Sequence, residues 1–120
     1  MGDVRETIEN MRKVYEAAAG PDATGGEYPE MIRLADQLQY DTRDYPGSVT
    51  IEEKLDDLRL HFARMCGVRK STHSYDQERE WAIRAIKSVE RSVNDAEETM
   101  KDKNWRRGLR PPPPSDPEGW

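Results

Sequence analysis

The sequence has few of the side chains that build a large hydrophobic core. Leu, Ile, Val and Phe together supply 18 of its 120 residues. So low a share accompanies disorder when the net charge is also high. Here 24 acidic residues are nearly balanced by 19 basic ones, which leaves a net charge of −5. Balanced charge on helical periodicity indicates solvated helix faces, so we expect one folded domain of marginal stability.

Cysteine and long apolar runs are nearly absent. With one cysteine, Cys66, the chain has no internal disulfide. Cys66 falls on the apolar side of an expected helix, where a thiol acts as a small hydrophobic group; an exposed reactive thiol is the alternative. No run approaches the roughly 20 apolar residues that cross a bilayer, and Met1–Thr7 lacks the hydrophobic stretch of a signal peptide. We therefore expect a cytoplasmic chain, alone or within a particle assembled there.

An excess of basic charge is missing as well. The sequence pI is near 5.1, whereas a general nucleic-acid binder needs a basic face to neutralise phosphates. The one dense basic cluster is Arg106, Arg107 and Arg110. It fits either solvated tail charges or a local phosphate contact, so nucleic acid is not an expected partner.

The sequence also lacks the motifs of known catalytic and cofactor sites. It has no strand alternation of useful length, no phosphate-binding loop and no nucleophile elbow. His61, Cys66 and His73 do not have a standard zinc spacing, and Asp57, four residues before His61, indicates a surface ion pair across one helical turn. We expect no enzyme, no cofactor, no metal and no small-molecule substrate.

Apolar spacing and end signals predict an all-α fold, a bundle of three or four helices over residues 1–105. The first expected helix begins at Asp3, with Glu6 at capping-box spacing, and ends before Gly20. The second has Pro29 in its first turn and ends near Tyr40. A third is expected after a capping box of Thr50 and Glu53, with Gly67 closing it, and a fourth after a capping box of Ser74 and Gln77, running to about Trp105.

The fourth expected helix carries a narrow apolar stripe, which we call the seam. Its members alternate in four- and three-residue steps: Ala82, Ile86, Val89, Val93, Ala96 and Met100. Such a stripe packs along another helix, yet the third expected helix is only about half as long. We expect the seam through Val89 to be core. From Val93 to Met100 it is either core, an exposed partner-binding surface or a homodimer coiled coil.

A proline-rich arm, residues 106–120, follows the bundle. Its four consecutive prolines favour the extended polyproline II conformation. Trp105 is expected either to anchor a partner contact or to fold back on the helix end, and Trp120 to enter a pocket of this protein or of a neighbour. The predicted partner-binding residues are Val93, Ala96, Met100, Trp105, Leu109, Pro111, Pro112, Pro113, Pro114 and Trp120.

Together these features predict a non-enzymatic protein–protein interaction protein. The leading hypothesis is a small structural or adaptor subunit of a larger assembly, such as a viral or phage particle, docked through the last helix and the arm. Its partner is another protein or a second copy in a homo-oligomer. The alternative hypothesis is a small acidic regulator or inhibitor that masks another protein, with Glu97 and Glu98 in the contact.

Overall fold

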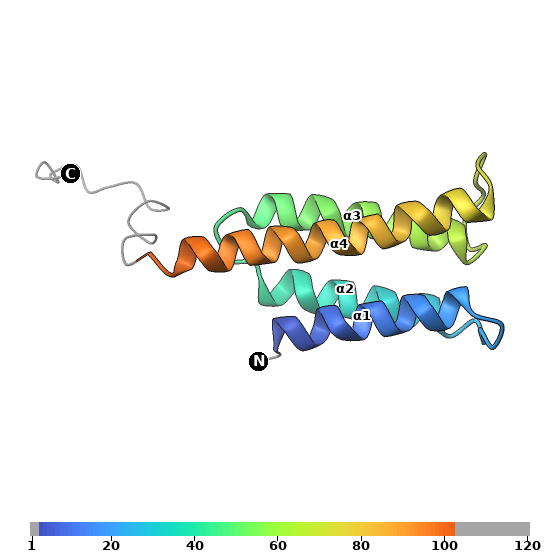
Figure 1. Cartoon of the computed structure of the whole chain (residues 1–120), viewed down its shortest axis with the longest axis horizontal. Coiled ribbons are helices and arrows are strands. Elements are labelled where there is room, and N and C mark those ends of the chain that lie inside the picture. The colour runs from blue at the N-terminus through green and yellow to red at the C-terminus, as the bar shows by residue number, and fades with distance from the viewer. Residues whose placement is uncertain (1–2, 103–120) are drawn as a thin grey trace, which may run out of the picture.

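The structure, a computed structural model, describes residues 3–102 and places four α-helices and no strand among them (Figure 1). The predicted all-α class is confirmed. The helices are α1 (Val4–Ala19), α2 (Glu27–Asp41), α3 (Ser48–Met65) and α4 (Tyr75–Met100). The predicted arm, residues 106–120, lies outside the described residues.

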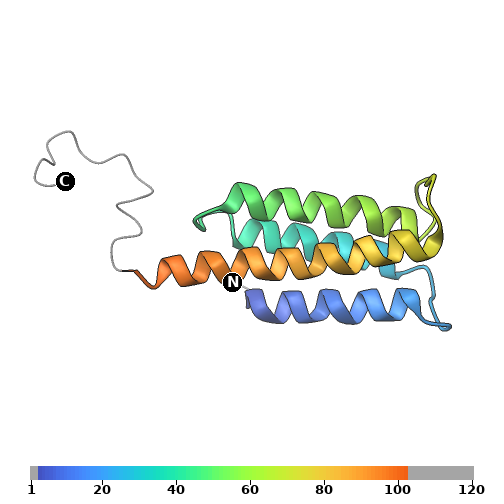
Figure 2. The ribbon, with the colours of Figure 1, turned by 45° about the horizontal axis from the view of Figure 1, so that its top comes forward.

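The helices run alternately up and down, so that each lies beside its neighbours in the chain (Figure 2). Contacts are most extensive between α3 and α4 and between α1 and α2, and α1 also packs against α4. The bundle is therefore two helical hairpins joined face to face. The start of α1 and the end of α4 lie at the same end of the bundle, which we call the αN/αC end.

Methionine and alanine compensate for the scarcity of larger aliphatic side chains in the core. Met11, Met31, Ala35 and Ala82 are completely buried, and Phe62 is the largest of the completely buried side chains in the described part of the chain. Every helix contributes an apolar face to this core. The core side chains are Val4, Ile8, Met11, Tyr15, Met31, Leu34, Ala35, Leu38, Ile51, Leu55, Leu58, Phe62, Met65, Ala82, Ala85, Ile86, Val89, Val93 and Ala96.

The predicted N-cap residues of α1 and α4 are confirmed. The Ser74 hydroxyl accepts a hydrogen bond from the Gln77 backbone N–H at 3.1 Å, as an N-cap does. Asp3 caps α1, although its carboxylate accepts from the backbone N–H of Arg5 at 3.0 Å.

The capping box predicted for α3 at Thr50 and Glu53 is wrong, because the N-cap lies three residues earlier than Thr50 and the helix begins at Ser48. Its N-cap is Gly47, which adopts a left-handed φ of 76° and makes no side-chain cap. Glycine reaches this conformation without steric cost. The Gly47 carbonyl then accepts the backbone N–H of Ile51 and starts the helix.

Gly67 ends α3 as predicted. Its φ is 80°, and the backbone N–H groups of Gly67 and Val68 donate to the carbonyls of Arg64 and Ala63. This is the Schellman arrangement, which satisfies the last carbonyls of a helix.

At its other end, α4 stops earlier than the predicted Trp105. The α-helical bonding gives way to a tighter turn at Asp102, whose backbone N–H donates to the Thr99 carbonyl three residues back. With 26 residues, α4 is about 39 Å long at 1.5 Å per residue. It is the longest of the four helices, and its last turns project beyond the αN/αC end (Figures 1 and 2).

Candidate functional site

The seam on α4 is buried for most of its length. Val93 is 0 % exposed and Ala96 is 4 % exposed, and both belong to the single core cluster. Met100 is half-buried and lies outside that cluster. Of the alternatives left open by the sequence, the core alternative is therefore correct for Val93 and Ala96. In this fold neither side chain is available as an exposed docking surface.

Besides the start of α3, two segments that lie far from α4 in the sequence help to cover the later part of the seam. The first turn of α1 contributes Val4 to the same core, and Arg5 forms an ion pair with Glu97 of α4. Tyr45, in the loop between α2 and α3, also packs against the core. Comparing α4 with α3 alone misses this cover, because it comes from parts of the chain far away in sequence.

The remaining predicted partner-binding residues lie outside the described range. They are Trp105, Leu109, Pro111, Pro112, Pro113, Pro114 and Trp120. Their roles stay predictions.

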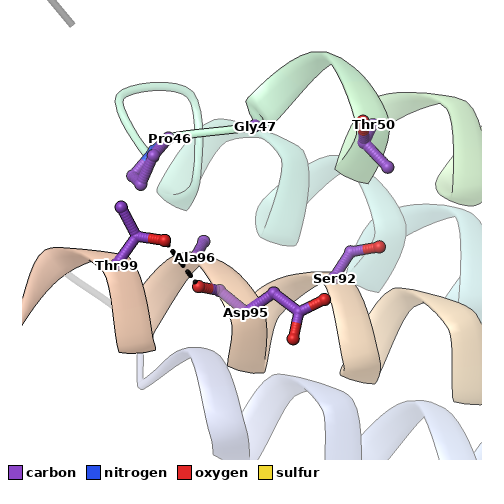
Figure 3. Close-up of a pocket in the computed structure, with 7 residues that line it drawn as sticks. All are labelled: Pro46, Gly47, Thr50, Ser92, Asp95, Ala96 and Thr99. Atoms are coloured by element: carbon purple, nitrogen blue, oxygen red, sulfur yellow. Dashed lines mark hydrogen bonds between the residues drawn. The ribbon is translucent and has the colours of Figure 1, made fainter. Parts of the chain in front are cut away.

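The outer surface between α3 and α4 is hollowed at two places. The first hollow, of about 260 Å³, lies at the αN/αC end (Figure 3). Its lining residues are Pro46, Gly47, Thr50, Ser92, Asp95, Ala96 and Thr99. The second hollow, of about 160 Å³, lies further from that end, and its lining residues are Lys54, Asp57, His61, Trp81, Arg84, Ala85 and Ser88.

The two hollows follow one line along the bundle, which we call the α3–α4 furrow. On α3 its lining positions advance from Gly47 to His61 in steps of three and four, and on α4 they run back from Thr99 to Trp81 with the same spacing. Residues so spaced share one helix face. The two helices are antiparallel neighbours, so these faces border a common furrow.

Charge changes sign along the furrow. At the αN/αC end the exposed acid is Asp95, whose backbone carbonyl accepts the Thr99 hydroxyl at 3.1 Å (Figure 3). In the second hollow the cations are Lys54 and Arg84, beside the single acid Asp57. Arg84 forms a same-helix ion pair with Glu80 at 2.9 Å.

The most polar buried group in the described part of the chain is Glu78, in the first turns of α4. Its side chain is 1 % exposed. One carboxylate oxygen lies 2.8 Å from His61 Nδ1 on α3, and the other accepts the hydroxyl of Ser71 in the α3–α4 loop. His73 Nδ1, also in this loop, lies 3.9 Å from the second oxygen. The carboxylate therefore joins both helices and the loop between them.

The electrostatics of Glu78 favour the ionised form. Burial raises its pKa, but hydrogen bonds from Ser71 and His61, with the electrostatic influence of His61 and Arg64, outweigh burial and lower the pKa below 4.5. Trp81 covers the cluster, with its ring centroid 5.1 Å from that of His61 and 4.7 Å from that of His73. The arrangement satisfies a buried charge and holds the loop against α4.

This cluster corrects the predicted ion pair of His61. Among residues 3–102 the carboxylate paired with His61 on this side is that of Glu78, although Asp57 and His61 both line the second hollow. A signal for Glu78 exists in the sequence, because it lies four residues before Ala82 and so on the same helix face as the seam. Because Glu78 is charged, a pattern of apolar side chains does not include it, and the predicted seam begins at Ala82.

Two further features of residues 3–102 concern metal binding and the reactivity of Cys66. No group of three or more His, Cys, Asp or Glu side chains in that range is arranged to hold a metal ion. Cys66 is an exposed residue at the end of α3. Partial burial of its thiol, together with the Glu27 carboxylate, raises the pKa to about 11. Since the thiolate is the reactive form, this exposed cysteine is poorly reactive at neutral pH.

The two acids named in the regulator hypothesis both have partners within the chain. Glu97 forms an ion pair with Arg5 across helices, and Glu98 with Lys101 on its own helix. Masking a partner through these acids would first require breaking those contacts.

Comparison with protein-family models, with curated proteins and with solved structures finds no match for this chain. Within residues 3–102, none of the helices combines the length and the apolar character needed to cross a bilayer. The site must therefore be interpreted from its own geometry.

Proposed function

We propose that this chain is a non-enzymatic protein–protein interaction protein, a small structural or adaptor subunit of a larger assembly. Its docking surface is the αN/αC end of the bundle. The observation that carries the proposal is the projection of α4 beyond the other helices at this end (Figures 1 and 2). Met100 continues the seam there, after Ala96 has completed the core.

Exposed apolar side chains at the same end support the proposal. Tyr40, near the end of α2, is 62 % exposed, and Val49, near the start of α3, is 66 % exposed. The Arg43 guanidinium lies 4.0 Å from the centre of the Tyr40 ring. Tyrosine and arginine are among the residues that carry most of the energy of protein interfaces.

Photo-crosslinking at matched positions tests this surface. A photoreactive phenylalanine analogue would replace Tyr40 in one variant and Tyr75 in the other. Tyr75 is a suitable control because it is 47 % exposed and begins α4 at the opposite end of the bundle. We expect a discrete crosslinked protein, or a crosslinked second copy, from position 40 in lysate of the producing cells and none from position 75. Equal crosslinking at both positions, or none at either, would contradict the proposed surface.

Self-association is measured separately by light scattering of the full-length chain across a dilution series. A dimer that dissociates when Met100 is changed to Asp would identify the partner as a second copy. A monomer at all concentrations would restrict the proposal to a different protein.

A further inference from the structure

The α3–α4 furrow has no cover among the described residues, although it is lined by side chains suited to contact. The described helices α1 and α2 pack on the other side of this pair. The small side chains of Ala85, Ser88 and Ser92 line its middle part, and the half-buried Trp81 lines its far end. A shallow, partly apolar channel with an aromatic side chain at one end suits an extended peptide.

The chain leaves α4 beside the start of this furrow. Thr99 lines the first hollow, three residues before the described chain ends at Asp102. A further 18 residues follow, 103–120. In the polyproline II conformation they would span about 55 Å at 3.1 Å per residue. The furrow from Thr99 to Trp81 is about 27 Å long at 1.5 Å per residue of helix. The segment is therefore long enough to turn back and follow the whole furrow.

The order of charges in that segment is the reverse of the order in the furrow. Its first half carries three arginines, Arg106, Arg107 and Arg110, and the residues after the prolines carry two acids, Asp116 and Glu118. A segment running back along α4 would bring the arginines past the acidic first hollow. Its acids would then reach the second hollow, where Lys54 and Arg84 outnumber the single lining acid, Asp57. Opposite charges in matching order fix the direction of docking.

We propose that residues 103–120 dock in the α3–α4 furrow of the same molecule, antiparallel to α4. The proline run then lies over the small side chains at the middle of the furrow, where a rigid extended segment costs little conformational entropy to bind. This proposal does not depend on the docking surface proposed above, because it concerns contacts within one chain.

Paramagnetic relaxation in the full-length chain tests the proposal. A Cys66→Ser, Ser115→Cys variant would carry one spin label after the proline run, and amide signals would be compared with the label oxidised and reduced. We expect the strongest loss of signal at Ser88 and Ser92, and a weaker loss at positions on α1, which packs against the other side of α4. Unchanged signals along α4 would overturn the proposal. In a mixture of spin-labelled unenriched chains with unlabelled ¹⁵N-enriched chains, docking within one molecule predicts no signal loss. Loss in that mixture would show exchange between copies and would also overturn it.

Charge reversal identifies the contacts. In the spin-labelled chain, Arg84→Glu should weaken docking and so restore much of the amide signal at Ser88 and Ser92. Adding Glu118→Arg to that variant should re-create an opposite-charge pair, and the signal should be lost again. Lys87→Glu is the matched control, because Lys87 is exposed on α4 but does not line either hollow. Circular dichroism of each variant verifies that the helices persist. Equal effects of Arg84→Glu and Lys87→Glu on the amide signals would exclude the furrow as the docking site.

Discussion

Glu78 illustrates how one polar side chain can organise several parts of a small core. A buried carboxylate costs free energy unless it is paired and hydrogen-bonded. Here His61 and Ser71 provide hydrogen bonds, and Arg64 supplies a nearby positive charge. Because these groups come from α3 and from the α3–α4 loop, ionised Glu78 stabilises one particular arrangement of the hairpin.

We expect the stability of the protein to decrease on acidification in a way that depends on Glu78. Its folded-state pKa lies below the ordinary 4.5, so the unfolded chain takes up the proton first as the pH falls. The contribution is complete above the unfolded-state pKa and is lost as the pH falls through the folded-state pKa. Urea unfolding at pH 6 and pH 3 should show a smaller difference between wild type and Glu78→Gln at pH 3. A difference independent of pH would contradict this account.

At the level of helices, apolar spacing predicts the buried faces well and the helix ends less well. Ser74 caps α4 as predicted, whereas Thr50 lies inside α3. Both residues have a Glu or Gln three positions later, so the pattern alone cannot separate them. The difference arises from Gly47, whose left-handed backbone begins α3 directly after the turn at Pro46. The residue at which α3 begins depends on how the preceding loop packs, and the local sequence does not specify that packing.

A pair of substitutions tests the two caps. Ser74→Ala should lower the free energy of unfolding by about 1 kcal/mol, because it removes the hydrogen bond to the first turn of α4. Thr50→Ala should change it by less than about 0.5 kcal/mol, because Thr50 is exposed within α3. Chemical denaturation of both variants gives the comparison. A larger loss of unfolding free energy for Thr50→Ala than for Ser74→Ala would support the predicted capping box at Thr50.

The end of the seam offers a second comparison between helix positions. Val93→Ala should cost about 2 kcal/mol, since it removes two buried methyl groups and leaves a cavity. Met100→Ala should cost well under half as much, because Met100 lies outside the core cluster. Urea midpoints measured at equal m-values provide the test. Similar losses for the two variants would place Met100 in the core.

The assembly of the whole bundle depends on contacts that no local pattern in the sequence reveals. Arg5 and Glu97, which form an ion pair between α1 and α4, are 92 positions apart in the chain. Arg12 and Glu90 form a second such pair, and the Tyr15 hydroxyl donates to the Arg79 carbonyl at 3.1 Å. The helices and their apolar faces could be predicted from spacing. Which helices pack against each other could not be predicted, because such polar helices offer many possible ion pairs of similar strength.

A double-mutant cycle on Arg12 and Glu90 measures how strongly charge joins the two hairpins. With side chains 30 % and 36 % exposed, the pair should have a coupling energy of about 0.5 to 1 kcal/mol at low salt. The control is the same-helix pair of Arg84 and Glu80, at 68 % and 52 % exposed, which should give about 0.3 kcal/mol. Equal coupling energies for the two pairs would mean that the Arg12–Glu90 ion pair adds no more to stability than an exposed pair within one helix.

The order of helices also sets how quickly the native bundle can form. Apart from the contact between α1 and α4, each extensive helix contact joins elements adjacent in the chain. Helical bundles with mainly local contacts reach the native state in about microseconds to milliseconds. The α1–α4 contact closes the longest loop and so carries the largest closure entropy. The late step in forming this molecule should therefore be the meeting of two preformed hairpins, in which α1 comes to lie against α4.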